Sequence, residues 1–192
     1  MIRSPLMTVM VDAVMKASKS LRRDFGELEN LQVSRKGPGD FVSLADHRAE
    51  NILREMLEKA RPDFGFVMEE GGVVEARDGE HRWHIDPLDG TTNFLHGFPQ
   101  YAVSIACMSQ GQLTQAVVYD PTRNDLFTAT KGRGAFLNDK RIRVSNRSKL
   151  QESLIGTGFP FRDFKHLDTY MGMFKDMVKK TSGIRRPGAA AL

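Results

Sequence analysis

The sequence predicts a layered α+β fold. Two helical segments come first, a run of short and mostly antiparallel strands follows, and another helix lies near the end of the chain. This order of helices and strands is typical of α+β architectures, in which each amphipathic element buries its apolar face against another layer. Because the 192 residues contain no internal repeat, low-complexity tract or interdomain linker, we expect residues 1–192 to form a single domain.

Apolar periodicity places the helices. Between residues 6 and 23, apolar side chains recur every three or four positions, which predicts a helix. A second helix is predicted to follow Ser43, which together with Asp46 has the form of a capping box, and to end before Pro62. Residues 164–180 have the same periodicity and predict the last helix.

The strands are short and are separated by turn residues. We predict them at residues 65–68, 82–85, 102–108, 113–119, 125–130, 134–137, 141–144 and 154–157. Two of the connections, residues 109–112 and residues 138–139, indicate hairpins. The strand that leads into Asp86 should end at Pro87, because proline has no N–H group to donate to the ladder.

Composition narrows the class of protein. The only cysteine, Cys107, cannot form a disulfide within the chain, which fits a reducing cytoplasm. No stretch approaches the roughly 20 apolar residues of a membrane-spanning helix, so we expect no membrane partner. The apolar start of the chain is interrupted by Asp12 and Lys16 and lacks a cleavage site, so we do not expect a signal peptide.

The chain is basic, with 28 Lys and Arg residues, 24 Asp and Glu residues and a net charge of +4. A group of the basic residues falls in one segment: Lys131, Arg133, Lys140, Arg141, Arg143, Arg147 and Lys149. A nucleic-acid-binding face is one interpretation of such a segment. A solvated hairpin is favoured, because aromatic side chains that could stack on bases are sparse there.

Residues with catalytic potential gather in residues 83–94, which read Trp-His-Ile-Asp-Pro-Leu-Asp-Gly-Thr-Thr-Asn-Phe. Asp86 and Asp89 flank a turn at a strand end, where carboxylates are suitable ligands for Mg²⁺. The N–H groups of Gly90 and Thr91 follow directly and can hold phosphate oxygens. Metal ligands and phosphate donors therefore fall within one short segment.

Further acids lie upstream of this segment. Glu69 and Glu70 follow a predicted strand, and Asp46 lies at the start of the second helix. If they meet the two aspartates, several carboxylates share one cavity, and cations are needed to neutralise them. Each piece alone has a simpler explanation. Asp-Pro and Asp-Gly are common turn dipeptides, and the glutamate pair could lie in an exposed loop.

In this order, the segments resemble the inositol monophosphatase family, within the lithium-sensitive, Mg²⁺-dependent phosphatase superfamily. The matching segments are Glu69-Glu70, residues 86–94, residues 96–99 (His-Gly-Phe-Pro), residues 102–106 (Ala-Val-Ser-Ile-Ala), residues 131–138 (Lys-Gly-Arg-Gly-Ala-Phe-Leu-Asn) and residues 183–191 (Gly-Ile-Arg-Arg-Pro-Gly-Ala-Ala-Ala). Together they extend over nearly the whole chain. The resemblance implies a layered αβαβα sandwich.

The resemblance also implies a metal site. Glu69, Asp86 and the carbonyl group of Leu88 would hold one Mg²⁺ ion. Asp86 and Asp89 would help to hold a second. The implied cofactor is therefore Mg²⁺, bound by carboxylate and carbonyl oxygens, as its preference for hard ligands requires.

Catalytic and substrate-binding roles follow from the same resemblance. Glu69 and Thr91 would orient and activate the attacking water, and Asp46 would support Thr91. The implied substrate-binding residues are Gly90, Thr91, Gly188 and Ala190. The implied reaction is hydrolysis of a small phosphomonoester, most of all myo-inositol 1-phosphate, by in-line attack of a metal-activated water.

Within the superfamily, residues 92–96 favour the monophosphatase branch, because nucleotide- and histidinol-phosphate relatives usually carry Lys or Arg where Thr92 stands. The family is commonly dimeric, and some of its bacterial members bind the transcription machinery. A homodimer and a transcription-machinery partner are therefore among the implied properties.

The family pattern continues beyond the last residue, Leu192, with a helix, further strands and a Trp-Asp motif that completes the second metal site. We therefore expect this sequence to lack the C-terminal part of the fold. Two interpretations follow. The chain is either a Mg²⁺-dependent phosphatase, with uncertain activity in this form, or a non-catalytic relative or fragment that acts as an interaction protein.

Overall fold

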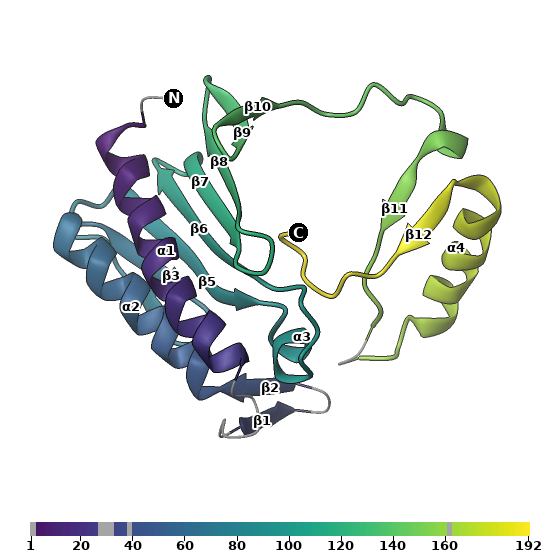
Figure 1. Cartoon of the computed structure of the whole chain (residues 1–192), viewed down its shortest axis with the longest axis horizontal. Helices are drawn as coiled ribbons and strands as arrows, with labels where there is room; N and C mark the ends of the chain where they lie inside the picture. Colours follow the sequence, from purple (N-terminus) through teal and green to yellow (C-terminus); the bar gives the residue numbers. More distant parts are fainter. Residues whose placement is uncertain (1–2, 27–32, 38–39, 161–162) are drawn as a thin grey trace.

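A computed structural model of the chain shows a layered α+β arrangement (Figure 1). The structure describes residues 3–26, 33–37, 40–160 and 163–192, and for residues 33–37 and 40–43 it describes the backbone alone. We distinguish a body, residues 3–142, from an arm, residues 150–186. Residues 143–149, the bridge, connect the two parts across the top of the view in Figure 1.

The body is built on an eight-stranded mixed sheet with the strand order β10-β9-β8-β7-β6-β5-β3-β4. Its strands are β3 (Gly65–Met68), β4 (Gly72–Val74), β5 (His81–Asp89), β6 (Ala102–Ser109), β7 (Gln112–Asp120), β8 (Asp125–Thr130), β9 (Gly134–Leu137) and β10 (Lys140–Ile142). Neighbouring strands are antiparallel except β3 and β5, which are parallel. A separate antiparallel hairpin consists of β1 (Val33–Gly37) and β2 (Asp40–Ser43).

Two helices, α1 (Pro5–Phe25) and α2 (Leu44–Ala60), pack together and cover one face of the sheet (Figure 1). Ser4 caps α1 by accepting a hydrogen bond from the Met7 N–H group at 3.2 Å, and Pro5 occupies the first helical turn. The core lies between this helix layer and the sheet, and its largest fully buried side chains include Leu21, Leu53, Phe66, Trp83 and Ile105. No described helix combines the length and apolar character that crossing a membrane requires.

The arm is a smaller unit. A 3-10 turn (Leu150–Glu152) leads into β11 (Leu154–Gly156), and helix α4 (Leu167–Lys180) then returns the chain to β12 (Gly183–Arg185). Strands β11 and β12 pair in parallel, with Ile155 opposite Ile184. No residue of α4 is buried, so the arm contributes little to the apolar core.

The structure corrects one expectation about the strand that carries the motif. Strand β5 does not end at Pro87 but continues to Asp89, and its ladder with β6 shifts register between Asp86 and Asp89. Because this irregularity leaves residues of β5 without a ladder partner, the missing N–H group of Pro87 breaks no hydrogen bond there. The bulge also turns the chain directly into a short helix, α3 (Thr91–Leu95).

Candidate active site

The carboxylates converge because β3 and β5 are adjacent parallel strands. Met68, the last residue of β3, lies opposite Ile85 of β5, so Glu69 and Asp86 follow side by side at the same edge of the sheet. Asp89 ends β5 just beyond the bulge. Parallel strands present their carboxyl ends at one edge, which is where ligand sites in α/β sheets lie.

Asp86 is in an unfavourable environment for a negative charge. Burial, followed by the negative charges of Glu69 and Asp89, raises the pKa of Asp86 to about 7, although the N–H group of Leu88 donates a hydrogen bond to its Oδ1 at 3.2 Å. A cation bound nearby would favour the ionised form of such a carboxyl group and lower its pKa. The electrostatics therefore fit a cation site.

Gly90 makes the turn from β5 into α3. Its φ is 94°, and a Cβ at this position would approach the carbonyl oxygen of Gln100 to 2.9 Å and the Cβ of Ala189 to 3.2 Å. Only glycine fits this conformation and spacing. The close approach places residues 187–190 against the start of α3, where the N–H groups of Gly90 and Thr91 lie.

Thr91 connects the motif to helix α2. Its Oγ1 lies 3.0 Å from the carbonyl oxygen of Leu88 and 3.4 Å from Oδ2 of Asp46, so its single proton has two acceptors within reach. Asp46 lies in the first turn of α2 and is 1% exposed. The hydroxyl group of Thr91 is thus positioned from two separate elements.

A second group of carboxylates overlaps the first. Asp46, Glu69 and Glu70 each offer an oxygen atom, and these atoms lie within 4.8 Å of one another. Glu70 is held by its backbone N–H group, which donates to Oε2 of Glu50 at 2.9 Å, and its carboxylate lies 3.9 Å from Nε2 of His47. The sequence had marked Glu70 only as the neighbour of Glu69 and had given it no role.

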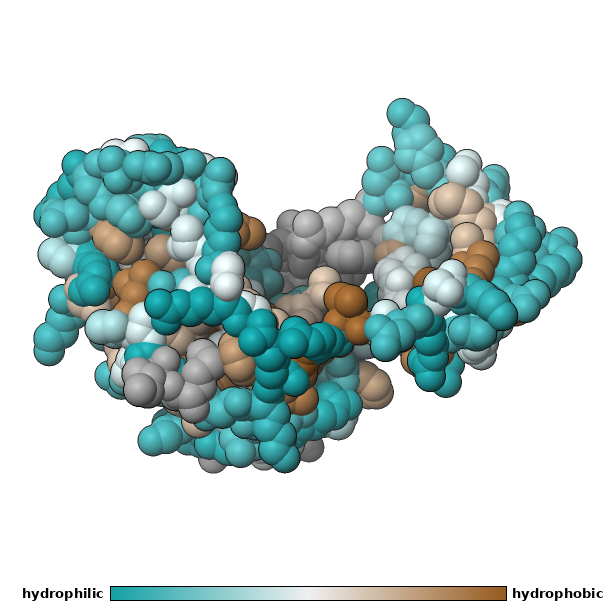
Figure 2. Space-filling view, turned by 90° about the horizontal axis from the view of Figure 1, so that it is seen from above, coloured by the Kyte–Doolittle hydropathy of each residue, from teal (hydrophilic) through white to brown (hydrophobic). Residues whose placement is uncertain are grey.

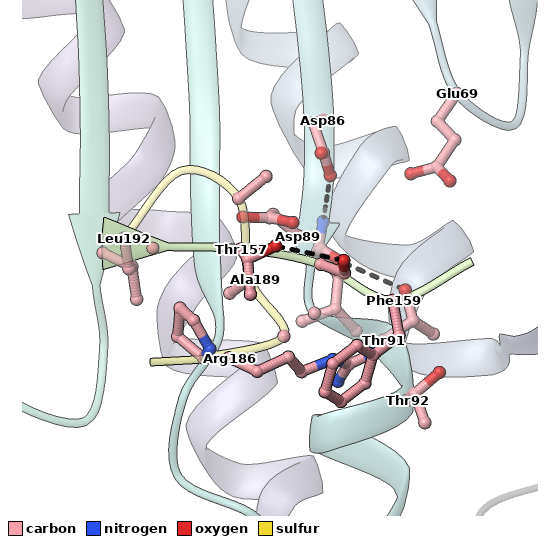
Figure 3. A pocket seen from close by; sticks show the side chains of 17 residues that line it. Glu69, Asp86, Asp89, Thr91, Thr92, Thr157, Phe159, Arg186, Ala189 and Leu192 are labelled. Atoms are coloured by element: carbon pink, nitrogen blue, oxygen red, sulfur yellow. Dashed lines mark hydrogen bonds between the residues drawn. The ribbon is translucent and has the colours of Figure 1, made fainter. Parts of the chain in front are cut away.

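These residues line a cavity of about 750 Å³. In the space-filling view from above, the surface is hollowed between the body and the arm (Figure 2). The cavity is lined by eight residues singled out in the sequence: Glu69, Asp86, Leu88, Asp89, Gly90, Thr91, Gly188 and Ala190. Asp46 does not line it but contacts Thr91, which does. The close-up shows the carboxylates of Glu69, Asp86 and Asp89 at one end (Figure 3).

The opposite wall comes from residues to which the sequence had assigned no role. Thr157 and Phe159 follow β11, and Arg186 follows β12; all three line the cavity (Figure 3). The guanidinium carbon of Arg186 lies 5.6 Å from the ring centre of Phe159, a cation–π contact. Arg186 belongs to the matching segment 183–191, but the sequence did not place it beside Phe159, because the two become neighbours only when β11 and β12 pair.

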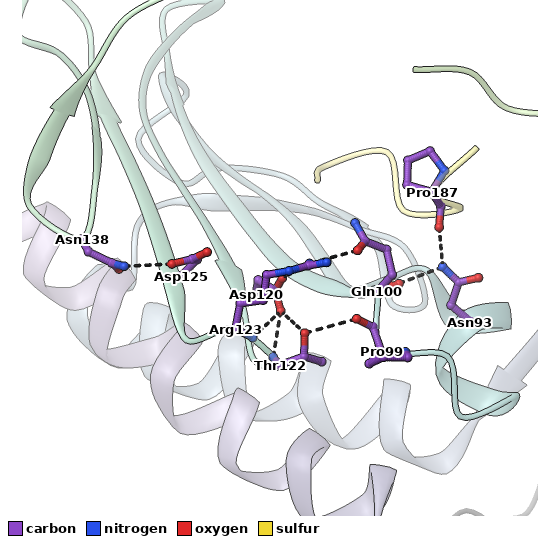
Figure 4. Close-up of polar contacts among 9 residues, drawn as sticks. All are labelled: Asn93, Pro99, Gln100, Asp120, Thr122, Arg123, Asp125, Asn138 and Pro187. Carbon is purple, nitrogen blue, oxygen red and sulfur yellow. Dashed lines mark hydrogen bonds and ion pairs between the residues drawn. The ribbon is translucent and has the colours of Figure 1, made fainter. Parts of the chain in front are cut away.

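Asn93 connects residues 187–190, which form the third wall of the cavity, to the body through hydrogen bonds. Its Nδ2 donates to the carbonyl oxygens of Gln100 at 2.8 Å and Pro187 at 2.9 Å (Figure 4). Gly188 follows with a φ of 82°, and a Cβ there would lie 2.8 Å from the Asn93 amide. A second glycine is therefore required where residues 187–190 pass over α3.

The loop that carries Gln100 is itself anchored. Asp120, which is 1% exposed, accepts hydrogen bonds from the N–H and hydroxyl groups of Thr122 and from the backbone and guanidinium of Arg123. Arg123 also donates to Oε1 of Gln100 at 3.0 Å, and the carbonyl oxygen of Pro99 lies 3.2 Å from Oγ1 of Thr122 as an alternative acceptor for its proton (Figure 4). The turn after β7 thus supports the segment on which Asn93 depends.

Comparison with known proteins identifies this arrangement. A model of the inositol monophosphatase family matches residues 2–192. The chain belongs to the inositol monophosphatase family. It is 54% identical to an inositol-1-monophosphatase of Mesorhizobium japonicum over 192 residues, which are 100% of this chain and 72% of that protein. It is 46% identical to the Nus factor SuhB of Pseudomonas aeruginosa, over 98% of this chain and 71% of that protein.

A solved structure agrees with the fold. The extragenic suppressor protein suhB from Bartonella henselae superposes with a TM-score of 0.94 at 52% identity, over 97% of this chain and 72% of that one. The predicted α+β class is confirmed. As a member of the inositol monophosphatase family, the chain is a phosphatase, and therefore a hydrolase, of a metal-binding family, and its acidic cluster fits that property.

Proposed function

We propose that this inositol monophosphatase relative hydrolyses a small phosphomonoester with Mg²⁺, and that myo-inositol 1-phosphate is its main substrate. One observation carries the proposal. Three carboxylates, those of Glu69, Asp86 and Asp89, line one cavity of about 750 Å³ together with Gly90 and Thr91, which carry the backbone donors and the hydroxyl group. Hydrolysis of a phosphate ester needs each of these groups. The carboxylates hold the cations that bind the phosphate oxygens, the backbone N–H groups donate to those oxygens, and the hydroxyl group holds the attacking water in line.

The donor set fits Mg²⁺. Glu69, Asp86, Asp89 and the carbonyl oxygen of Leu88 are hard oxygen ligands at the rim of one cavity. The raised pKa of Asp86 supports a cation there, because crowded carboxylates ionise together only against positive charge. When bound, the metal neutralises charge on the phosphate and lowers the pKa of water.

The chain's own residues do the positioning. The hydroxyl group of Thr91 donates its proton to Leu88 or Asp46, which leaves its lone pairs free to accept a hydrogen bond from the attacking water. Glu69 accepts a proton from the same water as general base. The N–H groups of Gly90 and Thr91 hold a phosphate oxygen, and residues 188–190 lie against the ring of the substrate.

A coupled assay of phosphate release tests the proposal. The 192-residue chain is incubated with myo-inositol 1-phosphate in EDTA and then with Mg²⁺ from 0.1 to 20 mM. We expect release only with Mg²⁺, and a kcat/KM for inositol 1-phosphate at least tenfold above that for AMP or histidinol phosphate. Equal rates of phosphate release in EDTA and in Mg²⁺ would contradict the proposed metal dependence. A higher kcat/KM for AMP than for inositol 1-phosphate would contradict the proposed substrate.

A second candidate function is suggested by the relatives named Nus factor SuhB. In this alternative the chain acts by binding the transcription machinery in the cytoplasm, as a homodimer, and its catalytic activity is secondary. Large apolar side chains exposed on α4, among them Met171 and Met173, support self-association. Light scattering at 1 and 100 µM reports the dimer. Co-purification of RNA polymerase subunits with a chain that releases no phosphate would favour this alternative.

A further inference from the structure

One edge of the body carries a concentrated positive charge that the candidate active site does not use. Residues 131–149 contain seven Lys or Arg residues and a single acid, Asp139, whereas the whole chain has 28 basic and 24 acidic residues. We call residues 131–149 the basic strip. It consists of the turn after β8, strand β9, the edge strand β10 and the bridge. The view from above shows mainly hydrophilic side chains along the bridge (Figure 2).

The charge of the basic strip is not neutralised within the chain. Its one acid, Asp139, pairs instead with Arg3 at 3.1 Å, and Arg3 lies outside the strip. Among the described residues, none of the seven cations forms an ion pair. Their recorded side-chain contacts are neutral, since Lys131 donates to the amide of Gln112 and Arg141 lies 5.8 Å from the ring centre of Phe136.

Two of the cations lie at the β9–β10 hairpin. Arg143 directly follows Ile142, which pairs with Ala135 as the last residue of the ladder. The guanidinium of Arg141 leans over Gly134, where its Nη2 lies 2.7 Å from the position that a Cβ would take. An anion bound at this edge would balance positive charge that no acid of the described chain neutralises.

The sequence arranges the donors in a row. Every second residue from 141 to 149 carries a side chain that can donate to a phosphate: Arg141, Arg143, Ser145, Arg147 and Lys149. No described non-glycine residue from 140 to 149 has a positive φ, and Lys149 is extended at φ −98° and ψ 135°. All residues from 140 to 149 are exposed. The strip therefore offers four exposed cations, Arg141, Arg143, Arg147 and Lys149, within nine residues.

We propose that the basic strip binds a single strand of nucleic acid through its phosphate groups, without reading its sequence. Several exposed and unpaired cations along one stretch of the described chain are complementary to a polymer with one negative charge in every unit. Arginine, which supplies four of the seven cations, matches phosphate oxygens with its planar fork. Base stacking is not expected, because the nearby ring of Phe136 is in contact with Arg141.

Protection of the sheet edge is the competing explanation. Cations on an edge strand discourage pairing with other chains, and β10 is an edge strand. However, that explanation accounts for charges on β10 alone. Arg143, Arg147 and Lys149 lie in the bridge, outside every strand, where there is no ladder to protect.

Fluorescence anisotropy tests the proposal without any reference to phosphatase activity. The 192-residue chain is titrated into a labelled 20-nucleotide oligouridylate in EDTA, with KCl varied from 50 to 200 mM. Each phosphate contact on a single strand contributes about −0.7 to the slope of log Kobs against log salt, so four contacts predict a slope of about −2.8. The triple variant Arg141→Gln/Arg143→Gln/Arg147→Gln should bind at least tenfold more weakly at 50 mM KCl, with a slope of about −0.7.

A matched control removes the same charge elsewhere. Lys16→Gln/Lys19→Gln/Arg22→Gln takes three cations from the exposed face of α1 and should leave binding within twofold. Should the first triple variant not fold, the double variant Arg143→Gln/Arg147→Gln changes only the bridge and should still lose severalfold in affinity.

Other outcomes would overturn the proposal. An equal loss in the α1 variant would mean that only net charge attracts the strand. Tighter binding of a 20-base-pair duplex, of polyglutamate or of phosphatidylserine vesicles would assign the strip to a different partner. Aggregation of the strip variant with unchanged affinity for the oligonucleotide would leave edge protection as its role.

Discussion

The body and the arm differ in what holds them together. In the body, two helices and a sheet enclose the aromatic and aliphatic core, and Trp83 and Leu53 are fully buried. In the arm, α4 buries no residue, and large apolar side chains such as Leu154 and Met173 are more than half exposed. The candidate active site lies where the two meet. It takes its carboxylates from the well-packed part and its opposite wall from the weakly packed part.

This difference suggests a division of labour. Carboxylates that share a cavity repel one another, so they need a scaffold stable enough to hold them together. Strands β3 and β5 provide it, since each is paired on both sides within the sheet and β5 packs against α2. The wall formed by Phe159 and Arg186 contains no carboxylate, so it does not require such a scaffold.

The largest effect should follow from removing a charge supplied by the body. Asp89→Asn replaces a proposed metal ligand by a neutral amide, while the amide oxygen can still accept the hydrogen bond that the Ala191 N–H group donates to Asp89 at 2.6 Å. The fold should persist, and Mg²⁺-dependent kcat/KM should fall about 10³-fold, because metal-ion charge stabilisation contributes several kcal/mol.

The matched control for this change is Asp12→Asn, which removes a carboxylate from the exposed face of α1. Its phosphate release should equal that of the unchanged chain. Full turnover by Asp89→Asn at saturating Mg²⁺ would show that Asp89 is not a ligand.

The contrast in packing itself predicts a large difference in stability. Leu53→Ala should lower the free energy of unfolding by about 2–5 kcal/mol, because a fully buried leucine leaves a cavity in the body. Met173→Ala changes a side chain on α4 that is 57% exposed. This change should shift the free energy of unfolding by no more than about 0.5 kcal/mol. Urea denaturation monitored through Trp83, the only tryptophan, measures both. A comparable loss of unfolding free energy in the two variants would show that the body and the arm do not differ in packing.

The sequence predicted the body better than the arm, for physical reasons. The limits of β3, β8 and β9 were predicted correctly because their apolar runs are bounded by turn residues. Strand β10 begins at Lys140 and not at 141, because the two-residue turn before it pairs Lys140 with Leu137. Its end at Ile142 also follows from pairing, since Ile142 opposite Ala135 is the last pair of the ladder.

The arm shows where pattern is insufficient. Helix α4 begins at Leu167 rather than at 164, because Asp163 accepts a hydrogen bond from the Lys165 N–H group at 2.8 Å and holds the chain in a turn. The wall residues Phe159 and Arg186 were assigned no role, although Arg186 lies in a matching segment, since the parallel pairing of β11 and β12 that brings them together is non-local. The motif from Asp86 to Thr91 was found because its residues are contiguous.

A smaller effect concerns the stability of the metal-free chain. The pKa of Asp86 is raised from 3.8 to about 7 in the folded state, so the folded state binds this proton more tightly than the unfolded state does. Its stabilising contribution is therefore fully present below about pH 4 and is lost as the pH rises through 7. Asp86→Asn removes this penalty, and in EDTA at pH 8 it should be more stable than the unchanged chain.

The size and sign of that effect can be checked together. Three pKa units correspond to about 4 kcal/mol, but Asp86 is partly exposed, and solvent screening reduces the expected gain to roughly 1–2 kcal/mol. Urea denaturation at pH 8 and at pH 4 should show the gain at the higher pH alone. A loss of stability at pH 8 would mean that the carboxylate is stabilised by its neighbours in the metal-free fold.

The smallest effect should come from loosening the contact between the body and the final segment. Asn93 donates to the carbonyl groups of Gln100 and Pro187, and Asn93→Ala removes both hydrogen bonds without touching a carboxylate. Residues 187–190 should then lie less closely against the cavity. A loss of about 1 kcal/mol in the free energy of substrate binding would appear as a roughly fivefold rise in KM for inositol 1-phosphate, with kcat nearly unchanged.

Asn93→Asp decides whether hydrogen bonding or packing is responsible for that effect. Aspartate has nearly the same size and shape, but its carboxylate cannot donate, and it would face two carbonyl oxygens. If donation from Nδ2 fixes the segment, Asn93→Asp should raise KM more than Asn93→Ala does, because it adds repulsion to the lost bonds. If packing against Gly188 is what matters, the aspartate variant should behave like the unchanged chain, and the alanine variant alone should be impaired. Asn146→Ala, an exposed position in the bridge, should leave both kinetic constants as they are.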